Sequence, residues 1–564
     1  MPDLARRLAV ARGDELADVV VEGAKVFSVF TREWLETDIA ICDGYIAGLG
    51  EYAGKEVVHG RGKYVVPGFV DAHMHLETTK LMPGEFARLV LPLGTTTVVA
   101  DPHEIANVLG TDGVHWLADL ADEIQLDVYF MASSTVPASK FESPRRALTP
   151  GDLEGLLHRR RVIGLAEMMN FPGVVSGFAS ELAKLELDGA VHVDGHAPSL
   201  LGKALNAYAS AGIRSDHEAR TVEEGRERLR AGMWLLIREA SAARNLEALL
   251  PLVKEYGPVR MAFCTDDREP EHIAEEGHMN SIVRAAVEHG IAPEDALVMA
   301  TLNPATWHGL THLGAIGPGY QADLLVLPDL ERFEPETVLK AGKPLEDVPP
   351  AKVPEWVRHT VRIQPVASND FQIPWEGGQA RVIGLIEGQI VTEALEEEPR
   401  VENGLAVADP SRDLSKIAVV ERHLGTGRMG IGFVRGFGLQ RGAMASTIAH
   451  DAHNIVVVGA SDDDMARAVQ RLAELGGGLV VIADMGVQAE LPLPVAGLLS
   501  VEPYEEVVRE TEACVDAVRE LGCTFPSPFQ MMAFLALSVI PKLKITDRGL
   551  IDVDEFEVAP LFAD

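Results

Sequence analysis

The segment Pro67-Gly-Phe-Val-Asp-Ala-His-Met-His-Leu-Glu77 follows an apolar run at 64–66 and contains two histidines one residue apart. Alternate side chains of an extended strand point to the same face, so His73 and His75 face one way. Imidazole is a common ligand of divalent metals. If the strand ends at the mouth of a barrel, the pair forms half of a metal site. Taken by itself, the pair is equally consistent with two neighbouring histidines, one of them structural.

Short apolar strands alternate with helical segments over residues 65–310. The expected strands lie at 64–75, 95–101, 127–132, 161–166, 190–194, 212–215, 233–237 and 259–264. Helical periodicity fills the intervals, for example at 113–124 and 246–256. Eight β/α units over about 245 residues match a (β/α)8 TIM-like barrel. A doubly wound open sheet is the alternative.

Turn-rich β patterns flank this region. Residues 1–64 contain short strands separated by Gly and Asp turns, and the pattern returns at 311–345, so we expect these two segments to form one β-sandwich domain. Residues 342–375 are rich in proline and are interpreted as a connector. Residues 376–564 are predicted to form a separate C-terminal α/β domain.

The composition narrows the class of partner. The chain has 564 residues, a net charge of −35, 47% apolar and 24% charged residues, typical of a soluble globular protein. The negative charge argues against nucleic acid. No apolar run of membrane-spanning length and no N-terminal leader are visible, which argues against a membrane partner. The four cysteines are scattered without a CxxC pattern, which fits a reducing cytoplasm.

Residues able to bind metal recur at the predicted strand ends, where barrel enzymes carry their function. They are His73 and His75 after the first strand, His103 and Glu104 after the second, Glu167 after the fourth, His196 after the fifth, His217 after the sixth and Asp266 after the eighth. Each alone is more often a cap or a solvated turn. Together, four imidazoles, one carboxylate placed to bridge and one terminal aspartate predict a binuclear centre that activates water.

The order His73-x-His75, Glu167, His196, His217, Asp266 resembles the amidohydrolase superfamily, whose members use a metal-bearing barrel with a flanking β-sandwich. Many members bridge their metals with a carboxylated lysine, where this sequence has Glu167. The segments 67–78, 100–108, 164–170, 263–268, 441–454 and 491–498 resemble the adenine deaminase family more closely, and this likeness covers nearly the whole chain.

The resemblance implies hydrolysis of adenine to hypoxanthine and ammonia with two divalent metals per active site, Mn²⁺ or Fe²⁺ rather than Zn²⁺. His73, His75 and Asp266 would hold one metal, His196 and His217 the other, and Glu167 would bridge them. Asp266 would accept the proton of the attacking hydroxide and pass it to the leaving amine. The family also implies a homodimer or larger homo-oligomer.

Attack at C6 of adenine builds charge on N1, which calls for a proton donor. The candidates are His103, Glu104 and Glu77, in that order; a role in orienting the metal ligands is the alternative. Asp267 and Arg268 are expected to orient Asp266 or the substrate, unless they form a surface salt bridge. The cluster that contains His450 and His453 is interpreted either as a substrate contact from above or as a structural network.

Other functions are compatible with parts of this pattern. A cyclic-amide hydrolase such as a hydantoinase or dihydroorotase uses the same barrel and metals, but more usually has a lysine at position 167. Other nucleobase aminohydrolases are separable only by substrate trial. A non-catalytic scaffold of this fold is expected to lose metal ligands, and here each one is present.

Overall fold

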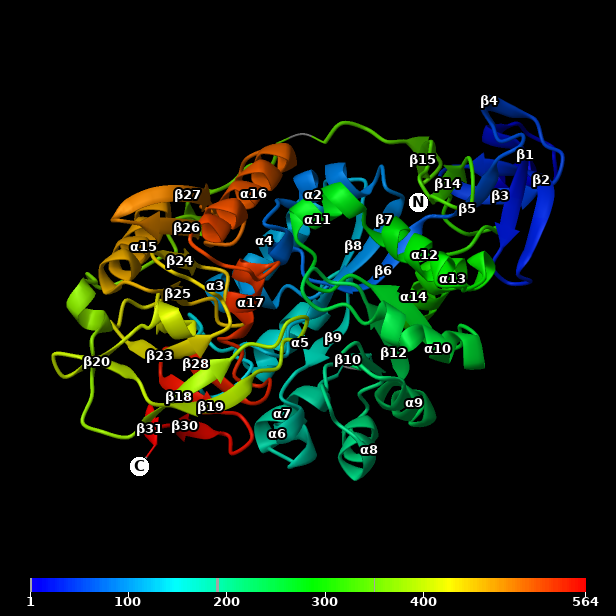
Figure 1. Ribbon diagram of the computed structural model, residues 1–564. Coiled ribbons are helices and arrows are strands. Elements are labelled where there is room, and N and C mark those ends of the chain that lie inside the picture. The colour runs from blue at the N-terminus through cyan, green and yellow to red at the C-terminus, as the bar shows by residue number, and fades with distance from the viewer. Residues whose placement is uncertain (1–2, 189–191, 349, 564) are drawn as a thin grey trace.

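The computed structural model describes residues 3–188, 192–348 and 350–563. Figure 1 shows an N-terminal sheet in blue on one side, parallel strands with helices in the middle, and a C-terminal sheet with its helices in yellow to red on the other side. The α/β class expected from the sequence is confirmed. No helix of the described residues is long and apolar enough to cross a membrane.

The N-terminal sheet is made from two segments far apart in sequence. After helix α1 (Leu4–Ala11), its order is β16-β15-β14-β5-β1-β2-β3, with β4 paired to β1. Its strands are β1 (Ala17–Ser28), β2 (Glu33–Cys42), β3 (Tyr45–Leu49), β4 (Gly54–His59), β5 (Tyr64–Pro67), β14 (Leu324–Leu327), β15 (Thr337–Lys340) and β16 (Lys343–Pro344). The antiparallel pairing of β5 with β14 brings residues 64–67 beside 324–327, as Figure 1 shows.

Parallel strands form the middle of the molecule. One sheet has the order β10-β9-β8-β7-β6 and a second the order β11-β12-β13. The strands are β6 (Phe69–Met74), β7 (Thr95–Ala100), β8 (Asp127–Ala132), β9 (Val162–Met168), β10 (Val193–Gly195), β11 (Ser215–Asp216), β12 (Trp234–Arg238) and β13 (Met261–Cys264). Because they run parallel, their carboxyl ends lie at one edge.

Backbone hydrogen bonds join the two parallel sheets at both edges. The N–H of Asp266 donates to the carbonyl of His73 at 3.0 Å, which connects the end of β13 to β6. At the other edge, the N–H of Arg214 donates to the carbonyl of Val193 at 3.3 Å. The residues that follow β13 are thereby held next to those that end β6.

Helices follow most of these strands. They are α2 (Pro83–Val90), α3 (His103–Leu109), α4 (Thr111–Ala121), α5 (Pro150–Leu157), α6 (Phe171–Val175), α7 (Ala179–Leu185), α8 (Gly202–Ser210), α9 (Val222–Arg230), α10 (Leu246–Tyr256), α11 (Pro270–Glu276), α12 (Met279–Glu288), α13 (Pro293–Ala300) and α14 (Leu302–Trp307). Buried apolar side chains such as Leu117, Leu205 and Leu249 fix them to the strands.

Three expected strands differ from the structure. The first, 64–75, is two strands, because at Gly68 the chain leaves the N-terminal sheet and enters the parallel sheet. A Cβ at position 68 would lie 2.2 Å from Oγ1 of Thr96, so only glycine fits there. The expected strand 190–194 begins at residues outside the described part of the chain, and β10 starts at Val193. The expected strand 212–215 is shortened to β11, Ser215–Asp216.

The C-terminal sheet has the order β19-β18-β23-β22-β25-β24-β26-β27, with β31 paired to β18. Its strands are β18 (Gln379–Gly384), β19 (Glu393–Glu397), β22 (Leu414–Val420), β23 (Met429–Arg435), β24 (Ala443–Ser446), β25 (Ile455–Gly459), β26 (Gly478–Ala483), β27 (Gly486–Pro492) and β31 (Phe562–Ala563). Small sheets β17-β21-β20 (373–374, 405–407, 400–402) and β28-β29-β30 (543–546, 549–552, 557–559) flank it. Helices α15 (Asp462–Leu475), α16 (Tyr504–Glu520) and α17 (Pro528–Phe534) complete this part.

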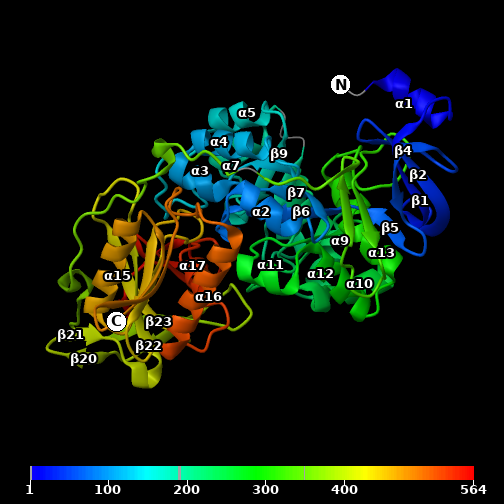
Figure 2. The same cartoon turned by 90° about the horizontal axis from the view of Figure 1, so that it is seen from above.

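Helix α17 lies between the C-terminal sheet and the parallel strands in both views (Figures 1 and 2). Its Gln530 side chain donates a hydrogen bond to the carbonyl of Asp267 at 2.8 Å. The C-terminal part therefore reaches the loop that follows β13, at the edge where the metal-ligand candidates lie.

Candidate functional site

The site begins with two histidines at the end of β6. His73 lies in the strand and His75 directly follows it, and they are 1% and 2% exposed. Asp71, on the same strand, accepts hydrogen bonds from the N–H of Thr265 at 3.1 Å and of His73 at 3.3 Å. Burial raises the pKa of Asp71 to about 7. These bonds fix the histidine strand against the segment that carries Asp266.

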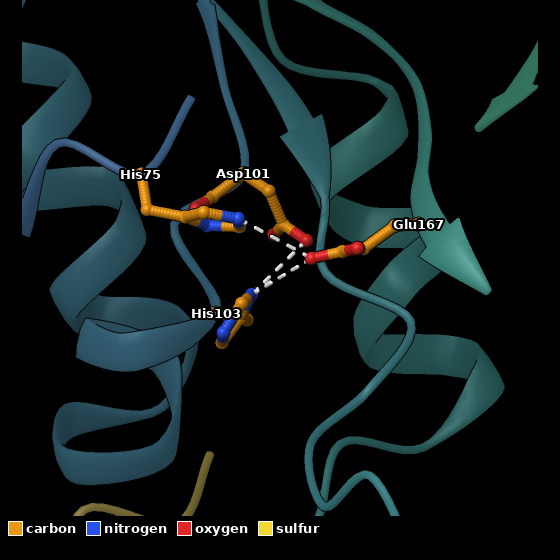
Figure 3. A group of neighbouring side chains, drawn as sticks. All are labelled: His75, Asp101, His103 and Glu167. Carbon is orange, nitrogen blue, oxygen red and sulfur yellow. Dashed lines mark hydrogen bonds and ion pairs between the residues drawn. The ribbon is translucent and has the colours of Figure 1, made fainter. Parts of the chain in front are cut away.

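Glu167, near the end of β9, lies at the centre of the site. Its Oε1 is 3.3 Å from Nε2 of His75. Its Oε2 is 2.9 Å from Nδ1 of His196 and 3.2 Å from Nε2 of His217. Figure 3 shows the Glu167 side chain meeting His75, with Asp101 and His103 beside them. Each carboxylate oxygen thus faces different imidazoles, as a carboxylate shared by two cations would.

Asp266 completes the group from the loop after β13. Its Oδ1 is 3.1 Å from Nε2 of His75 and 3.7 Å from Nε2 of His73. Its Oδ2 lies 2.7 Å from Nη1 of Arg238, which also pairs with Glu218. The two oxygens of Asp266 therefore have separate partners, one among the histidines and one a guanidinium.

Charged neighbours determine how the two carboxylates ionise. Burial alone would raise the pKa of Asp266, but Arg238, followed by His73 and His75, holds that pKa well below its usual range. Burial also opposes ionisation of Glu167, yet its imidazole neighbours, His196 first, hold its pKa well below the usual value. Both side chains are anionic at neutral pH, as metal ligands must be.

The donor atoms fit a divalent metal. Within the described residues, Nε2 of His73, which lies 3.7 Å from Oδ1 of Asp266 and 4.0 Å from Oε1 of Glu167, is buried without a hydrogen-bond partner. A buried polar atom without a partner costs about 1–3 kcal/mol, and a cation removes that cost. Imidazole nitrogens together with carboxylate oxygens suit Mn²⁺, Fe²⁺ or Zn²⁺. The clusters that contain these residues are fully buried.

A buried ion pair supports His196 and His217, the histidines that directly follow strands β10 and β11. Asp216 accepts from Arg228 Nε at 2.9 Å and from the N–H of Ala197 at 2.8 Å. Arg228 also donates to the carbonyl of Ala197. Because Asp216 precedes His217 and Ala197 follows His196, this pair fixes the position of both ligand candidates.

The pocket above these residues is lined by both halves of the chain. Its polar side includes Glu218, Arg238 and Asp267 in addition to the ligand candidates. Its apolar side consists of Met169, directly after β9, and of Ile390, Phe534 and Leu537 from the C-terminal part. His450 also lines the pocket, and its ring stacks on Phe534 with centroids 4.7 Å apart. A flat, apolar-faced molecule with polar edges suits such a pocket.

Comparison with known proteins identifies the family. The amidohydrolase family model matches residues 64–345, and the model of the adenine deaminase C-terminal domain matches residues 389–557. Adenine deaminase 2 of Carboxydothermus hydrogenoformans is 46% identical over 566 residues, which cover 98% of each chain. The chain belongs to the adenine deaminase family. The resemblance noted in the sequence is therefore confirmed.

Further adenine deaminase relatives agree. The adenine deaminase of Methylobacterium nodulans is 46% identical over 561 residues, 99% of each chain. That of Brucella anthropi is 46% identical over 557 residues, which cover 98% of this chain and 99% of the relative. Among solved structures, molinate hydrolase has a TM-score of 0.44 at 17% identity, covering 60% of this chain and 97% of that one.

The remaining candidate residues of this adenine deaminase family member divide into two groups. His103, Asp267 and His450 line the pocket. The other candidates do not line it. Glu104, Glu77 and His453 are buried outside its lining, and Arg268 donates to Glu276 and to the carbonyl of Glu239. Glu77 instead accepts from the N–H of Ile105 at 3.1 Å, at the start of α3.

Several residues of the site were not predicted from the sequence. Arg238 ends β12, directly after the predicted strand 233–237, and its charge at a strand end was an available signal. Asp101, which ends the second predicted strand, faces Nδ1 of His103 through Oδ2 at 3.2 Å. Ile390, Phe534 and Leu537 gave no signal, because only the folded contact between distant segments brings them to the pocket.

Proposed function

We propose that the chain hydrolyses adenine to hypoxanthine and ammonia at a pair of divalent metals. One observation carries the metal chemistry: the two oxygens of Glu167 face separate imidazoles, His75 on one side and His196 and His217 on the other. The near full-length identity to adenine deaminases carries the choice of substrate.

His73, His75 and Asp266 would hold one metal, His196 and His217 the second, and Glu167 would bridge them. When bound, the metals acidify a water molecule and so supply hydroxide at neutral pH. Mn²⁺ or Fe²⁺ is proposed on the family resemblance, and the nitrogen and oxygen donors without thiolate suit both.

Asp266 is the general base in this proposal. Its Oδ1 lies at the histidine cluster, where the attacking oxygen must be, while Arg238 holds Oδ2. The carboxylate takes the proton of the nucleophile and gives it to the amine that leaves from C6. Arg238 fixes the orientation of Asp266 and keeps it ionised for the next turnover.

The proton for N1 comes from Asp267 in this proposal. Among the carboxyls that line the pocket, Glu167 and Asp266 face the histidines and Glu218 pairs with Arg238. Asp451 faces Nε2 of His103 at 3.3 Å. Within the described residues, Oδ1 of Asp267 is buried without a hydrogen-bond partner. A protonated carboxyl there donates to a ring nitrogen. His103, Glu104 and Glu77, favoured by the sequence, are the alternatives. Of these, His103 lines the pocket, whereas Glu104 and Glu77 are not among the lining residues.

The apolar lining holds the purine ring. Met169, Ile390, Phe534 and Leu537 present side chains without hydrogen-bonding groups, which suits the faces of a planar heterocycle. Since three of these four come from residues beyond 376, the C-terminal part helps to form the substrate site. Displacement of water by this lining strengthens the charge interactions below it.

We also propose how the parts of the chain are arranged. The parallel strands would form one closed (β/α)8 barrel over residues 65–310, which the hydrogen bonds at both sheet edges support. Residues 1–64 and 311–345 would form the β-sandwich unit and 376–564 the C-terminal unit, assembled as a homodimer or larger oligomer.

The test is a substrate panel. The chain is purified with Mn²⁺ and offered adenine, other aminated nucleobases, a hydantoin and dihydroorotate, and the release of ammonia or of ring-opened acid is measured. Ammonia release from adenine above all other compounds is the expected result. No release from adenine, with turnover of another ring, would replace this function by that of a different amidohydrolase.

A further inference from the structure

A second cluster of ligand-type side chains lies where α3 meets the C-terminal part. His103 and Glu104 come from α3, and His450 and Asp451 come from the loop between β24 and β25. All four are buried, with exposed fractions between 0% and 3%. Within the described residues, Nε2 of His103, both carboxylate oxygens of Glu104 and both of Asp451 have no hydrogen-bond partner. Five such atoms in one place require an explanation.

The distances between these atoms resemble the edges of a coordination polyhedron. Nε2 of His103 is 3.3 Å from Oδ1 of Asp451 and 3.6 Å from Oε1 of Glu104. Nδ1 of His450 is 3.7 Å from Oδ1 of Asp451. For metal–ligand bonds of about 2.1 Å, neighbouring ligands of a tetrahedral ion lie about 3.4 Å apart. The longer two of the three contacts exceed hydrogen-bond length but match this spacing.

The orientation of His103 supports the same interpretation. Its Nδ1 faces Oδ2 of Asp101 at 3.2 Å, and Oδ1 of Asp101 accepts from the hydroxyl of Ser133 at 2.7 Å. A carboxylate only accepts, so Nδ1 carries the hydrogen and the lone pair is on Nε2, which points at Asp451. A carboxylate that orients a histidine through its far nitrogen is the usual surrounding of a metal ligand.

His453 lies in the same cluster by distance, but its hydrogen bonds exclude it as a ligand. Its Nδ1 accepts from the N–H of Ala449 at 3.1 Å. A neutral imidazole that accepts at Nδ1 carries its hydrogen at Nε2 and has no lone pair there for a metal. His453 therefore provides a control that is adjacent to the ligands and is not one of them.

We infer that His103, His450 and Asp451, with Glu104 beside them, form a further divalent-cation site, adjacent to the cluster around Glu167 but built on other donor atoms. The donors, two imidazoles and one or two carboxylates, select a first-row cation such as Mn²⁺, Fe²⁺ or Zn²⁺. The cation fixes the loop 447–454 of the C-terminal part to α3. This site goes beyond the proposed function and does not depend on it.

Crystals grown with Mn²⁺ test the site through anomalous scattering at the manganese edge. The expected map has a peak between His103, His450 and Asp451 in addition to density at Glu167. Density at Glu167 alone overturns the further site and leaves the proposed function intact. A peak at Asp451 with none at Glu167 supports the further site and overturns the metal pair of the proposed function.

Metal content measured by plasma mass spectrometry after desalting gives an independent readout. Asp451→Asn keeps the side-chain shape and removes the charge, and is expected to lower bound Mn²⁺ by one equivalent per chain relative to the parent. His453→Asn, whose amide oxygen can take the place of Nδ1, is expected to leave the content unchanged. Equal metal content in the parent chain and in Asp451→Asn overturns the site. If Asp451→Asn fails to fold, the anomalous map of the parent chain still decides, because that experiment uses no variant.

Discussion

Nη1 of Arg238 lies 2.7 Å from Oδ2 of Asp266, and both side chains are buried. The same guanidinium binds Glu218 through both of its terminal nitrogens, with Nη2 3.1 Å from Oε2 and Nη1 paired with Oε1, so Glu218 fixes the orientation of Arg238. A general base at a strand end must be kept both ionised and aimed. In the proposed mechanism Arg238, at the end of the neighbouring strand β12, does both for Asp266, while Oδ1 of Asp266 faces the histidine cluster.

Replacement of Arg238 by methionine is expected to lower kcat about 100-fold, in the range found when a group that orients a catalytic acid or base is removed. The pKa of Asp266 is held low by Arg238, so its loss raises that pKa. Because the base must be ionised, the acid limb of the kcat profile moves to higher pH. Arg238→Lys keeps the charge and should retain the parent pH profile better than methionine; an unchanged profile in Arg238→Met contradicts the role.

Asp266→Asn is expected to reduce turnover of adenine by at least about 10³-fold, because the amide cannot accept the proton. Metal at the site of His196 and His217 is expected to stay bound, since these ligands are unaltered. Steady-state kinetics and metal analysis on one preparation separate the two effects. Near-normal turnover would remove Asp266 from the mechanism.

Phe534→Ala tests whether the C-terminal part contacts the substrate. Loss of the aromatic face is expected to raise KM for adenine about tenfold, equal to about 1.4 kcal/mol, with a smaller change in kcat. Phe529→Ala, on the same helix α17 but outside this pocket lining, is the matched control. Equal KM values for Phe534→Ala and the parent would show that the ring is held elsewhere.

Arg228→Met leaves Asp216 as an unpaired buried carboxylate and is expected to cost about 3–5 kcal/mol. Because Asp216 holds the segments of His196 and His217, metal retention should fall together with the melting temperature. Arg226→Met lies on the same helix α9, but its partners Glu223 and Glu255 are exposed. Calorimetry should show no change for this control; the same loss in both variants would mean that α9 itself had been damaged.

The convergence of the ligand candidates at one edge could be predicted from two local rules. Alternation along a strand places His73 with His75, and parallel strands bring their carboxyl ends to one edge. Glu167, His196, His217 and Asp266 follow at that edge, and the structure brings all six side chains together. The exact strand limits were less predictable, since Gly68 divides an apolar run that reads as continuous.

Contacts between distant segments could not be predicted in this way. No local pattern relates Phe534 to Met169, or Asp451 to His103, because these pairs depend on how the C-terminal sheet is placed on the parallel strands. Arg268 was predicted to contact the substrate or Asp266 because it follows Asp267 in sequence. In the structure its side chain bonds to Glu276 and does not line the pocket. Adjacency along a loop does not decide which way a side chain points.

The change from one sheet to the other at Gly68 has a consequence for biosynthesis. Strand β5, directly before the histidine strand, pairs with β14, which lies more than 250 residues later in the chain. During translation, residues 64–67 have no partner on that side until residues 324–327 have left the ribosome. His73 and His75 are thus synthesised early, but the preceding strand β5 gains its partner β14 late. Closure of the N-terminal sheet at β5 is therefore a late event, which follows synthesis of more than half of the polypeptide.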